Sequence, residues 1–312
     1  MAISGRRCVR GRAIHPGLSN LGQTTLARSV SLAGLGVHNG KDTGVTIAPA
    51  SGDAGIVFIA DGQEIEALWL NAQALQRQTS LMANGVAIAT IEHLTATLMS
   101  LGVDNAMVHV TGGEVPAMDG SARCFVEAID EVGLVCLKQQ KKILRVVKPV
   151  RVSDGAAWAQ LTPAPSGLSF DVEVTFRQPI GRQRHILSLT SETFRKELAS
   201  ARSFGSLDEA ERLWSQGVAL GASLENSLVY DEKGVLNPHG ERYENECARH
   251  KMLDAIGDLA LAGAPLVGAF RSYRSGHRLN VTLLKAAFDA GALVLEKARN
   301  SPACGQMTAV SP

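Results

Sequence analysis

The sequence predicts an α+β fold with two similar domains, because its two halves repeat one order of elements. In the first half, alternating apolar and polar residues predict strands within 24–50 and at 55–59. A helix is expected at about 91–101, where apolar residues share one face and Gly102 ends it. A further strand is expected at 105–110.

The second half repeats this order with other residues. Strand-like segments at 143–152, 158–163 and 168–176 come before a helix at about 244–261 and a strand at 266–273. Because each unit has strands on both sides of one helix, we expect each half to form a sheet with helical cover.

Domain boundaries are expected where the composition changes. An apolar segment at about 204–230 has no counterpart in the first half and is expected to be an insert in the second. The expected parts are an N-terminal extension (1–23), a first α+β domain (24–137), a charged linker (138–142), a second α+β domain (143–298) and a flexible tail (299–312). The arginine-rich extension is either disordered, which we favour, or a targeting leader.

Composition narrows the class of protein. The chain of 312 residues is 45% hydrophobic and 20% charged, which is typical of globular domains. Its net charge of +1 and aromatic content of 4% argue against a nucleic-acid binder. The longest uncharged apolar run, 259–270, is shorter than the roughly 20 residues that a membrane span needs. Five scattered cysteines contain no CxxC pair, so we expect a cytoplasmic protein with reduced thiols. We also expect the protein to be a monomer.

The sharpest local motif is His250-Lys-Met-Leu-Asp254, with Asp258 one turn further along. Residues at i, i+4 and i+8 lie on one stripe of a helix, and a histidine and a carboxylate one turn apart can hold one zinc ion. Taken alone, the motif fits a solvated helix face better. Gly257 costs about 1 kcal/mol relative to alanine within a helix, which indicates that another group approaches the backbone there.

Two other motifs carry candidate catalytic residues. Glu92 and His93 lie in the first turn of the earlier helix, for which Thr90 is the expected N-cap. Adjacent helical residues point about 100° apart, so one can bind a metal while the other reaches its water. His277, expected in a loop near Arg274, suits an acid or electrostatic role toward an anionic substrate. Each feature alone is more often an ordinary surface residue.

Together the motifs resemble the family of UDP-3-O-acyl-N-acetylglucosamine deacetylases, the zinc enzymes of lipid A biosynthesis. The resemblance runs from about residue 24 to residue 288 and is specific because seven blocks occur in the right order. These blocks are 34–40, 90–94, 102–106, 114–121, 201–205, 249–259 and 275–277. The resemblance implies two α+β domains packed helix layer to helix layer in a β-α-α-β sandwich, with the active site between them.

The resemblance also implies a metal site and two principal catalytic groups. Its zinc ligands fall on His93, His250 and Asp254, which leaves a fourth position open. Glu92 would be the general base for the water that zinc activates. His277 would be an electrostatic stabiliser or general acid.

Further roles follow from the same resemblance. Asp258 would orient the catalytic histidine, and Ser203, where the family usually has threonine, would stabilise the oxyanion. Lys251 would act in catalysis and bind substrate together with Arg274, and Phe204 would pack on the sugar. Gln178 and Ser206 also depart from the family pattern, which leaves the preferred acyl chain open.

The implied reaction is removal of the N-acetyl group of UDP-3-O-(3-hydroxyacyl)-N-acetylglucosamine, with release of acetate, as the committed step of lipid A biosynthesis. The implied cofactor is Zn²⁺ and the partner is this small-molecule substrate. Two alternatives are a zinc amidohydrolase of the same fold on another N-acyl sugar and a non-catalytic sugar-nucleotide-binding homologue. Whether Glu92 or His277 protonates the leaving amine is left open.

Overall fold

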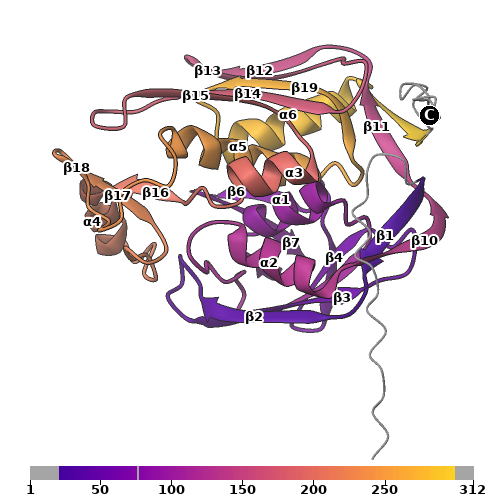
Figure 1. Ribbon diagram of the computed structural model, residues 1–312, viewed down its shortest axis with the longest axis horizontal. Coiled ribbons are helices and arrows are strands. Elements are labelled where there is room, and N and C mark those ends of the chain that lie inside the picture. The colour runs from indigo at the N-terminus through magenta and orange to yellow at the C-terminus, as the bar shows by residue number, and fades with distance from the viewer. Residues whose placement is uncertain (1–20, 76, 299–312) are drawn as a thin grey trace, which may run out of the picture.

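The computed structural model describes residues 21–75 and 77–298. Most of the expected extension, up to residue 20, and the expected tail from residue 299 lie outside the described residues. Figure 1 shows four layers: a sheet of the second half, helices α5 and α6, helices α1 and α2, and a sheet of the first half. The expected β-α-α-β sandwich of two α+β units is therefore confirmed.

The first half contains a five-stranded sheet in the order β2-β3-β9-β4-β5, in which β4 and β9 run parallel. Its strands are β2 (Val30–Leu35), β3 (Asp42–Pro49), β4 (Ile56–Ala60), β5 (Gln63–Glu66) and β9 (Ala106–Thr111). In β3, Val45 and Ile47 point to the buried face, as alternation along a strand requires. The helices covering this face are α1 (Glu92–Leu101) and α2 (Arg123–Val132).

Two smaller sheets complete the first half. One holds β6 (Ala72–Leu75), β7 (Gln78–Ala83) and β8 (Val86–Ile88), which lead directly into α1. The other pairs β1 (Gly22–Leu26) with β10 (Leu134–Gln140). Residues 138–142, expected to be a linker, lie at the end of β10 and the start of β11 apart from Lys141. The connection between the halves is thus one residue between two strands, while the domain boundaries themselves stay predictions.

The second half is built on a seven-stranded sheet. Its path is β12-β13-β19-β11-β20, and β14, paired with β15, also joins β19. The strands are β11 (Lys142–Val146), β12 (Val150–Asp154), β13 (Ala157–Thr162), β14 (Leu168–Thr175), β15 (Arg182–Ser188), β19 (Leu266–Tyr273) and β20 (Leu293–Lys297). Helices α5 (Glu246–Ala260) and α6 (His277–Asp289) cover it, and a short α3 (Ser191–Thr193) runs into a π-helical turn (Phe194–Leu198).

The insert projects from one end of the sandwich, at the left of Figure 1. It contains β16 (Phe204–Ser206), α4 (Leu207–Ser215), β17 (Leu228–Asp231) and β18 (Gly234–Val235). The N–H groups of Leu220 and Gly221 donate to the carbonyls of His38 and Val37, at 3.2 and 3.0 Å. The insert therefore reaches back to the first half across the end of the helix layers. Among the described residues, no helix has the length and apolar character needed to cross a membrane.

The two helix layers meet where α1 crosses α5. Nine of the ten residues of α1 are buried, because the helix has a sheet on one side and α5 on the other. A Cβ atom at Gly257 would lie 2.0 Å from the carbonyl oxygen of Glu92, so only glycine allows this approach. The hydroxyl of Thr95 also donates to the carbonyl of Gly257 at 3.1 Å. The close approach expected at Gly257 is confirmed, and the approaching group is the backbone of α1.

A buried ion pair fixes the start of α5 against the chain that enters the insert. The guanidinium of Arg202 donates to both carboxylate oxygens of Glu246, at 2.8 and 3.0 Å. The side chains of Arg202 and Glu246 are only 8% and 0% exposed. Burial alone would raise the pKa of Glu246, but the hydrogen bonds from Arg202 and the main chain of Arg242 lower it. The pair is therefore charged in the folded protein.

Removing one member of this pair should destabilise the fold strongly. Arg202→Ala is expected to lower the free energy of unfolding by about 3–5 kcal/mol, because it leaves a buried carboxylate without its counter-charge. Urea unfolding followed by circular dichroism measures the change. The control is Arg28→Ala, whose partner Glu131 is 71% exposed; it should change stability by less than about 0.5 kcal/mol. Similar small losses in both variants would contradict the assignment of Arg202 and Glu246 as a stabilising pair.

Candidate metal centre and active site

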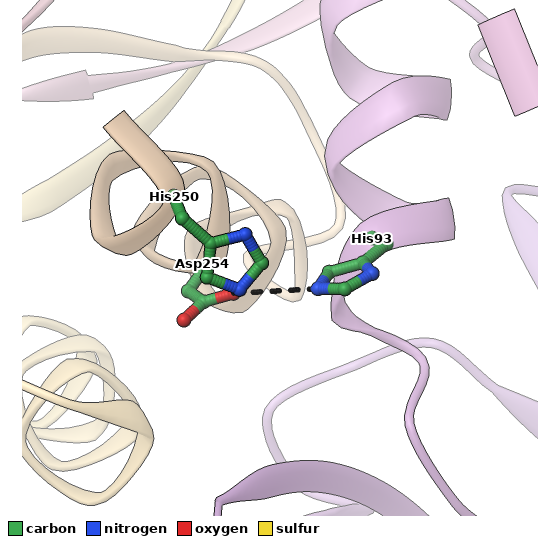
Figure 2. Close-up of side chains that lie close together, drawn as sticks. All are labelled: His93, His250 and Asp254. Carbon is green, nitrogen blue, oxygen red and sulfur yellow. Dashed lines mark ion pairs between the residues drawn. The ribbon is translucent and has the colours of Figure 1, made fainter. Parts of the chain in front are cut away.

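Three potential metal ligands converge at the crossing of α1 and α5. His93 comes from α1, and His250 and Asp254 lie one turn apart on α5. Figure 2 shows their side chains pointing toward one another. The Nε2 atoms of His93 and His250 lie 3.6 and 3.3 Å from Oδ1 of Asp254, and one ligand atom of each residue lies within 4.8 Å of the others. The three side chains are 3–7% exposed, so they are not a solvated helix face.

The donor set fits a zinc-like ion. Two ligands about 2.1 Å from a common tetrahedral ion lie about 3.4 Å apart, close to the separations seen here. Oδ1 of Asp254 is buried and accepts no hydrogen bond from any described residue, although a buried carboxylate oxygen normally has a partner. A cation between the three side chains would satisfy it.

Neighbouring groups orient these ligands. Nδ1 of His250 lies 3.1 Å from the carbonyl oxygen of Ala201, which can only accept, so Nδ1 carries the proton and Nε2 presents its lone pair. Burial lowers the pKa of His250 to about 4, which keeps the ring neutral. The ammonium of Lys251 donates to Oδ2 of Asp254 at 2.6 Å. Burial would raise the pKa of Asp254, but its interactions with the neighbouring His250 and Lys251 hold it well below its usual value.

Glu92 lies beside this cluster at the start of α1. Its side chain is 3% exposed, and Oε2 accepts the main-chain N–H of Thr79 at 3.1 Å. Burial raises the pKa of Glu92. Oε1 lies 3.9 Å from Nε2 of His277. A carboxylate with a raised pKa at the edge of a metal site can take a proton from water at neutral pH.

His277 is held by a buried carboxylate. Its Nδ1 lies 3.0 Å from Oδ2 of Asp258, which is 0% exposed, and its Nε2 lies 3.8 Å from Oδ2 of Asp254. Burial alone would lower the pKa of His277, yet the charge of Asp258 and its hydrogen bond raise it to about 9. The ring is therefore an imidazolium at neutral pH. His277 is the first residue of α6, which corrects the expectation that it lies in a loop.

The start of α1 also differs from the expectation. Ile91 occupies the N-cap position without a side-chain hydrogen bond, so Thr90 is not the cap. The hydroxyl of Thr90 lies 2.9 Å from the carboxylate of Glu114 and 3.0 Å from Oε1 of Gln78. Its backbone φ is 58°, which is costly for a β-branched residue. The contact with Glu114, and not a capping role, therefore sets the conformation of Thr90.

The three candidate ligands line a cavity of about 610 Å³. Of the expected site residues, only the buried Asp258 does not line it. The ring of Phe204 lies 6.0 Å from that of His250, and the main chain of Ser203 donates to the carbonyl of Gly120 at 2.7 Å. Arg274 lies at the rim, and its side chain is exposed. The insert supplies an apolar wall formed by Leu207, Leu213, Trp214, Ala219, Val229 and Leu236.

Four further residues in or next to the cavity were not predicted from the sequence. His38 and Arg77 line it from the first half. Thr79 and Asn280 donate to Asp258 at 2.6 and 2.8 Å. A single polar residue carries no periodic signal, so only the folded contacts identify these four.

Two histidines and an aspartate from facing helices, with a buried glutamate beside them, are the groups that metal-dependent hydrolases use. The family pattern of the UDP-3-O-acyl N-acetylglycosamine deacetylases matches residues 23–289. UDP-3-O-acyl-N-acetylglucosamine deacetylases of Brucella ovis and Brucella melitensis are each 45% identical to this chain over 273 residues, which is 86% of this chain and 95% of theirs. The chain therefore belongs to the UDP-3-O-acyl N-acetylglycosamine deacetylase family.

Proposed function

We propose that this protein hydrolyses the N-acetyl group of a UDP-3-O-acyl-N-acetylglucosamine and releases acetate, as a step of lipid A biosynthesis. The family match supports the reaction, and the cluster of His93, His250 and Asp254 beside Glu92 supports the site. The observation that carries most weight is the buried Oδ1 of Asp254, which has no partner among the described residues and faces two imidazole nitrogens.

We propose zinc as the ion held by His93, His250 and Asp254. When bound, it would supply a Lewis acid that polarises the acetyl carbonyl and lowers the pKa of water. Histidine nitrogen and carboxylate oxygen suit zinc, and the separations of 3.3 and 3.6 Å between donor atoms suit a tetrahedral site. Lys251 neutralises Oδ2 of Asp254, while Oδ1 faces His93 and His250.

The protein groups then divide the proton transfers. Glu92 takes a proton from the attacking water, for which its raised pKa makes it a suitable base at neutral pH. The imidazolium of His277 stabilises the negative charge that develops on the acetyl oxygen, together with the hydroxyl of Ser203. The carbon–nitrogen bond of the amide breaks, acetate leaves, and the sugar nitrogen gains a proton to become a free amine.

The cavity supports an acylated, anionic substrate. Its apolar wall from the insert suits an acyl chain, and Phe204 offers a ring on which a sugar can pack. Lys251, Arg274 and Arg77 place positive charge along the same cavity, where it would attract phosphates. A cytoplasmic monomer remains the prediction from the sequence for its location and oligomeric state.

A direct test combines metal analysis with a substrate comparison. The purified protein should contain about one zinc per chain, and it should release acetate from UDP-3-O-acyl-N-acetylglucosamine much faster than from UDP-N-acetylglucosamine. Equal turnover of the two substrates would favour an amidohydrolase of another N-acyl sugar. No acetate release from zinc-loaded protein with either substrate would favour a non-catalytic binding protein and overturn the proposal.

A further inference from the structure

Thr79 makes hydrogen bonds to two buried carboxylates near the candidate site, those of Glu92 and Asp258. It is a residue of β7 with 0% exposure. Its main-chain N–H donates to Oε2 of Glu92 at 3.1 Å, and its hydroxyl donates to Oδ1 of Asp258 at 2.6 Å. An ionised carboxylate can only accept, so the single hydroxyl proton of Thr79 belongs to the bond with Asp258. The short distance is typical of a charge-assisted bond.

We propose that Thr79 is a positioning residue for the deacetylation, whose hydroxyl fixes the carboxylate of Asp258 and thereby the ring of His277. This inference rests on the proposed function of the site. It deepens that function by assigning a role to a residue outside the cavity, which contacts neither the metal ligands nor the space for substrate.

The hydrogen bonds around Asp258 explain why one hydroxyl matters. Asp258 is 0% exposed, so water cannot replace a lost donor. Its Oδ1 accepts from Thr79, its Oδ2 accepts from the side-chain amide of Asn280 at 2.8 Å, and Nδ1 of His277 lies 3.2 and 3.0 Å from the two oxygens. Donors from β7 and α6 therefore hold the carboxylate plane from both sides, and this plane sets the direction of His277.

The same residue also fixes the distance between the two catalytic groups. Nε2 of His277 lies 3.9 Å from Oε1 of Glu92, and both side chains line the cavity. Thr79 holds Glu92 through its main chain and Asp258 through its side chain. A valine at this position would keep the first contact and the packing volume and would remove only the second. The hydroxyl can thus be tested separately from the strand that carries it.

Thr79→Val is expected to lower kcat by about 10–100-fold, as the loss of a group that orients an active-site side chain does, with KM and zinc content unchanged. Thr79→Ser, which keeps the hydroxyl, should restore most of the activity. Thr25→Val is the matched control, because it removes another buried hydroxyl that bonds the carbonyl of Asn105 far from this contact. It should keep the wild-type kcat. A wild-type kcat in Thr79→Val would overturn the inference.

A double-mutant cycle shows whether Thr79 acts through Asp258. In an Asp258→Ala background the acceptor is already absent, so adding Thr79→Val should cause no further loss of kcat. An equal loss in both backgrounds would mean that the hydroxyl acts independently of Asp258, which would overturn the proposed route.

A spectroscopic measurement keeps the inference separate from the proposed function. In metal-free protein labelled with ¹⁵N at histidine, the Nδ1–H signal of His277 should shift and exchange faster with water in Thr79→Val, but not in Thr25→Val. An unchanged signal in Thr79→Val would overturn the inference even if the protein is an active deacetylase. If the wild type releases no acetate, the proposed function fails. This measurement would still show whether the hydroxyl of Thr79 orients His277 through Asp258.

Discussion

Glu92→Ala is expected to lower kcat by about 10²–10⁴-fold while the zinc content stays at the wild-type value. Two buried carboxylates of the described residues lie within 4 Å of Nε2 of His277. One belongs to the proposed ligand Asp254, and the other belongs to Glu92. Its carboxylate is held by Thr79, so it is placed to accept a proton without binding the ion. Kinetics with the acylated UDP-sugar and metal analysis of the same preparation measure both effects.

The matched variant is His250→Ala, which should lose zinc and activity together. His250 is proposed as one of three ligands, and the contact of its Nδ1 with the carbonyl of Ala201 leaves Nε2 free to bind an ion. Comparing the two variants therefore distinguishes a general base, whose loss leaves zinc bound, from a metal ligand, whose loss does not. Equal loss of zinc from Glu92→Ala and His250→Ala would contradict the assignment of Glu92 as the base.

Gly257→Ala is expected to lower kcat by about 10²-fold although residue 257 contacts no substrate. The new Cβ would lie 2.0 Å from the carbonyl oxygen of Glu92, and an ordinary contact needs more than 3.4 Å. Helix α1 must therefore move away from α5 by about 1 Å or more, and displacements of this size are costly in an active site. The shift also separates His93 from His250 and Asp254, so zinc affinity should fall.

The control for this helix is Ala260→Gly, which weakens helix propensity in α5 by about 1 kcal/mol without adding an atom to the crossing. It should lower the melting temperature but keep kcat and zinc. Isothermal titration calorimetry with zinc measures the zinc affinity of both variants. A loss of affinity in Gly257→Ala alone would be due to the displaced helices and not to lower overall stability. Full activity with wild-type zinc affinity in Gly257→Ala would show that the crossing tolerates a side chain.

Periodic patterns predicted the elements that carry the metal ligands. The expected helices at 91–101 and 244–261 are α1 (Glu92–Leu101) and α5 (Glu246–Ala260), and the expected strand at 266–273 is β19. These elements have clear apolar spacing and, for α1, a glycine that ends the helix in the left-handed conformation at φ 80°. The cost of Gly257 within a helix also indicated a close approach, which the crossing with α1 explains.

Features that depend on distant contacts could not be read in this way. Helix α6 was not expected, and its first residue, His277, was assigned to a loop because Gly276 and the preceding Ser275 are typical of turns. Thr90 matches a cap locally but bonds to Glu114, which is 24 residues away. The segment 143–152 reads as one strand, yet the chain breaks it into β11 and β12. In each case a tertiary contact or a change of direction overrides the local preference.

For the site residues, too, local patterns were predictable and distant contacts were not. The spacing of His250 and Asp254 predicted one stripe of a helix, but burial on that stripe depends on α1, and only the resemblance to a family connected it with His93. The roles of Ser203, Lys251, Arg274 and Phe204 rest on that resemblance and on their positions around the cavity.

The central claim is that α1 and α5 enclose one metal ion between His93, His250 and Asp254. An anomalous difference map of the zinc-loaded protein, recorded at the zinc absorption edge, tests it most directly. We expect a single strong peak about 2.0–2.2 Å from Nε2 of His93, Nε2 of His250 and a carboxylate oxygen of Asp254. A peak elsewhere, or zinc bound to the α5 pair alone with His93 turned away, would contradict the account.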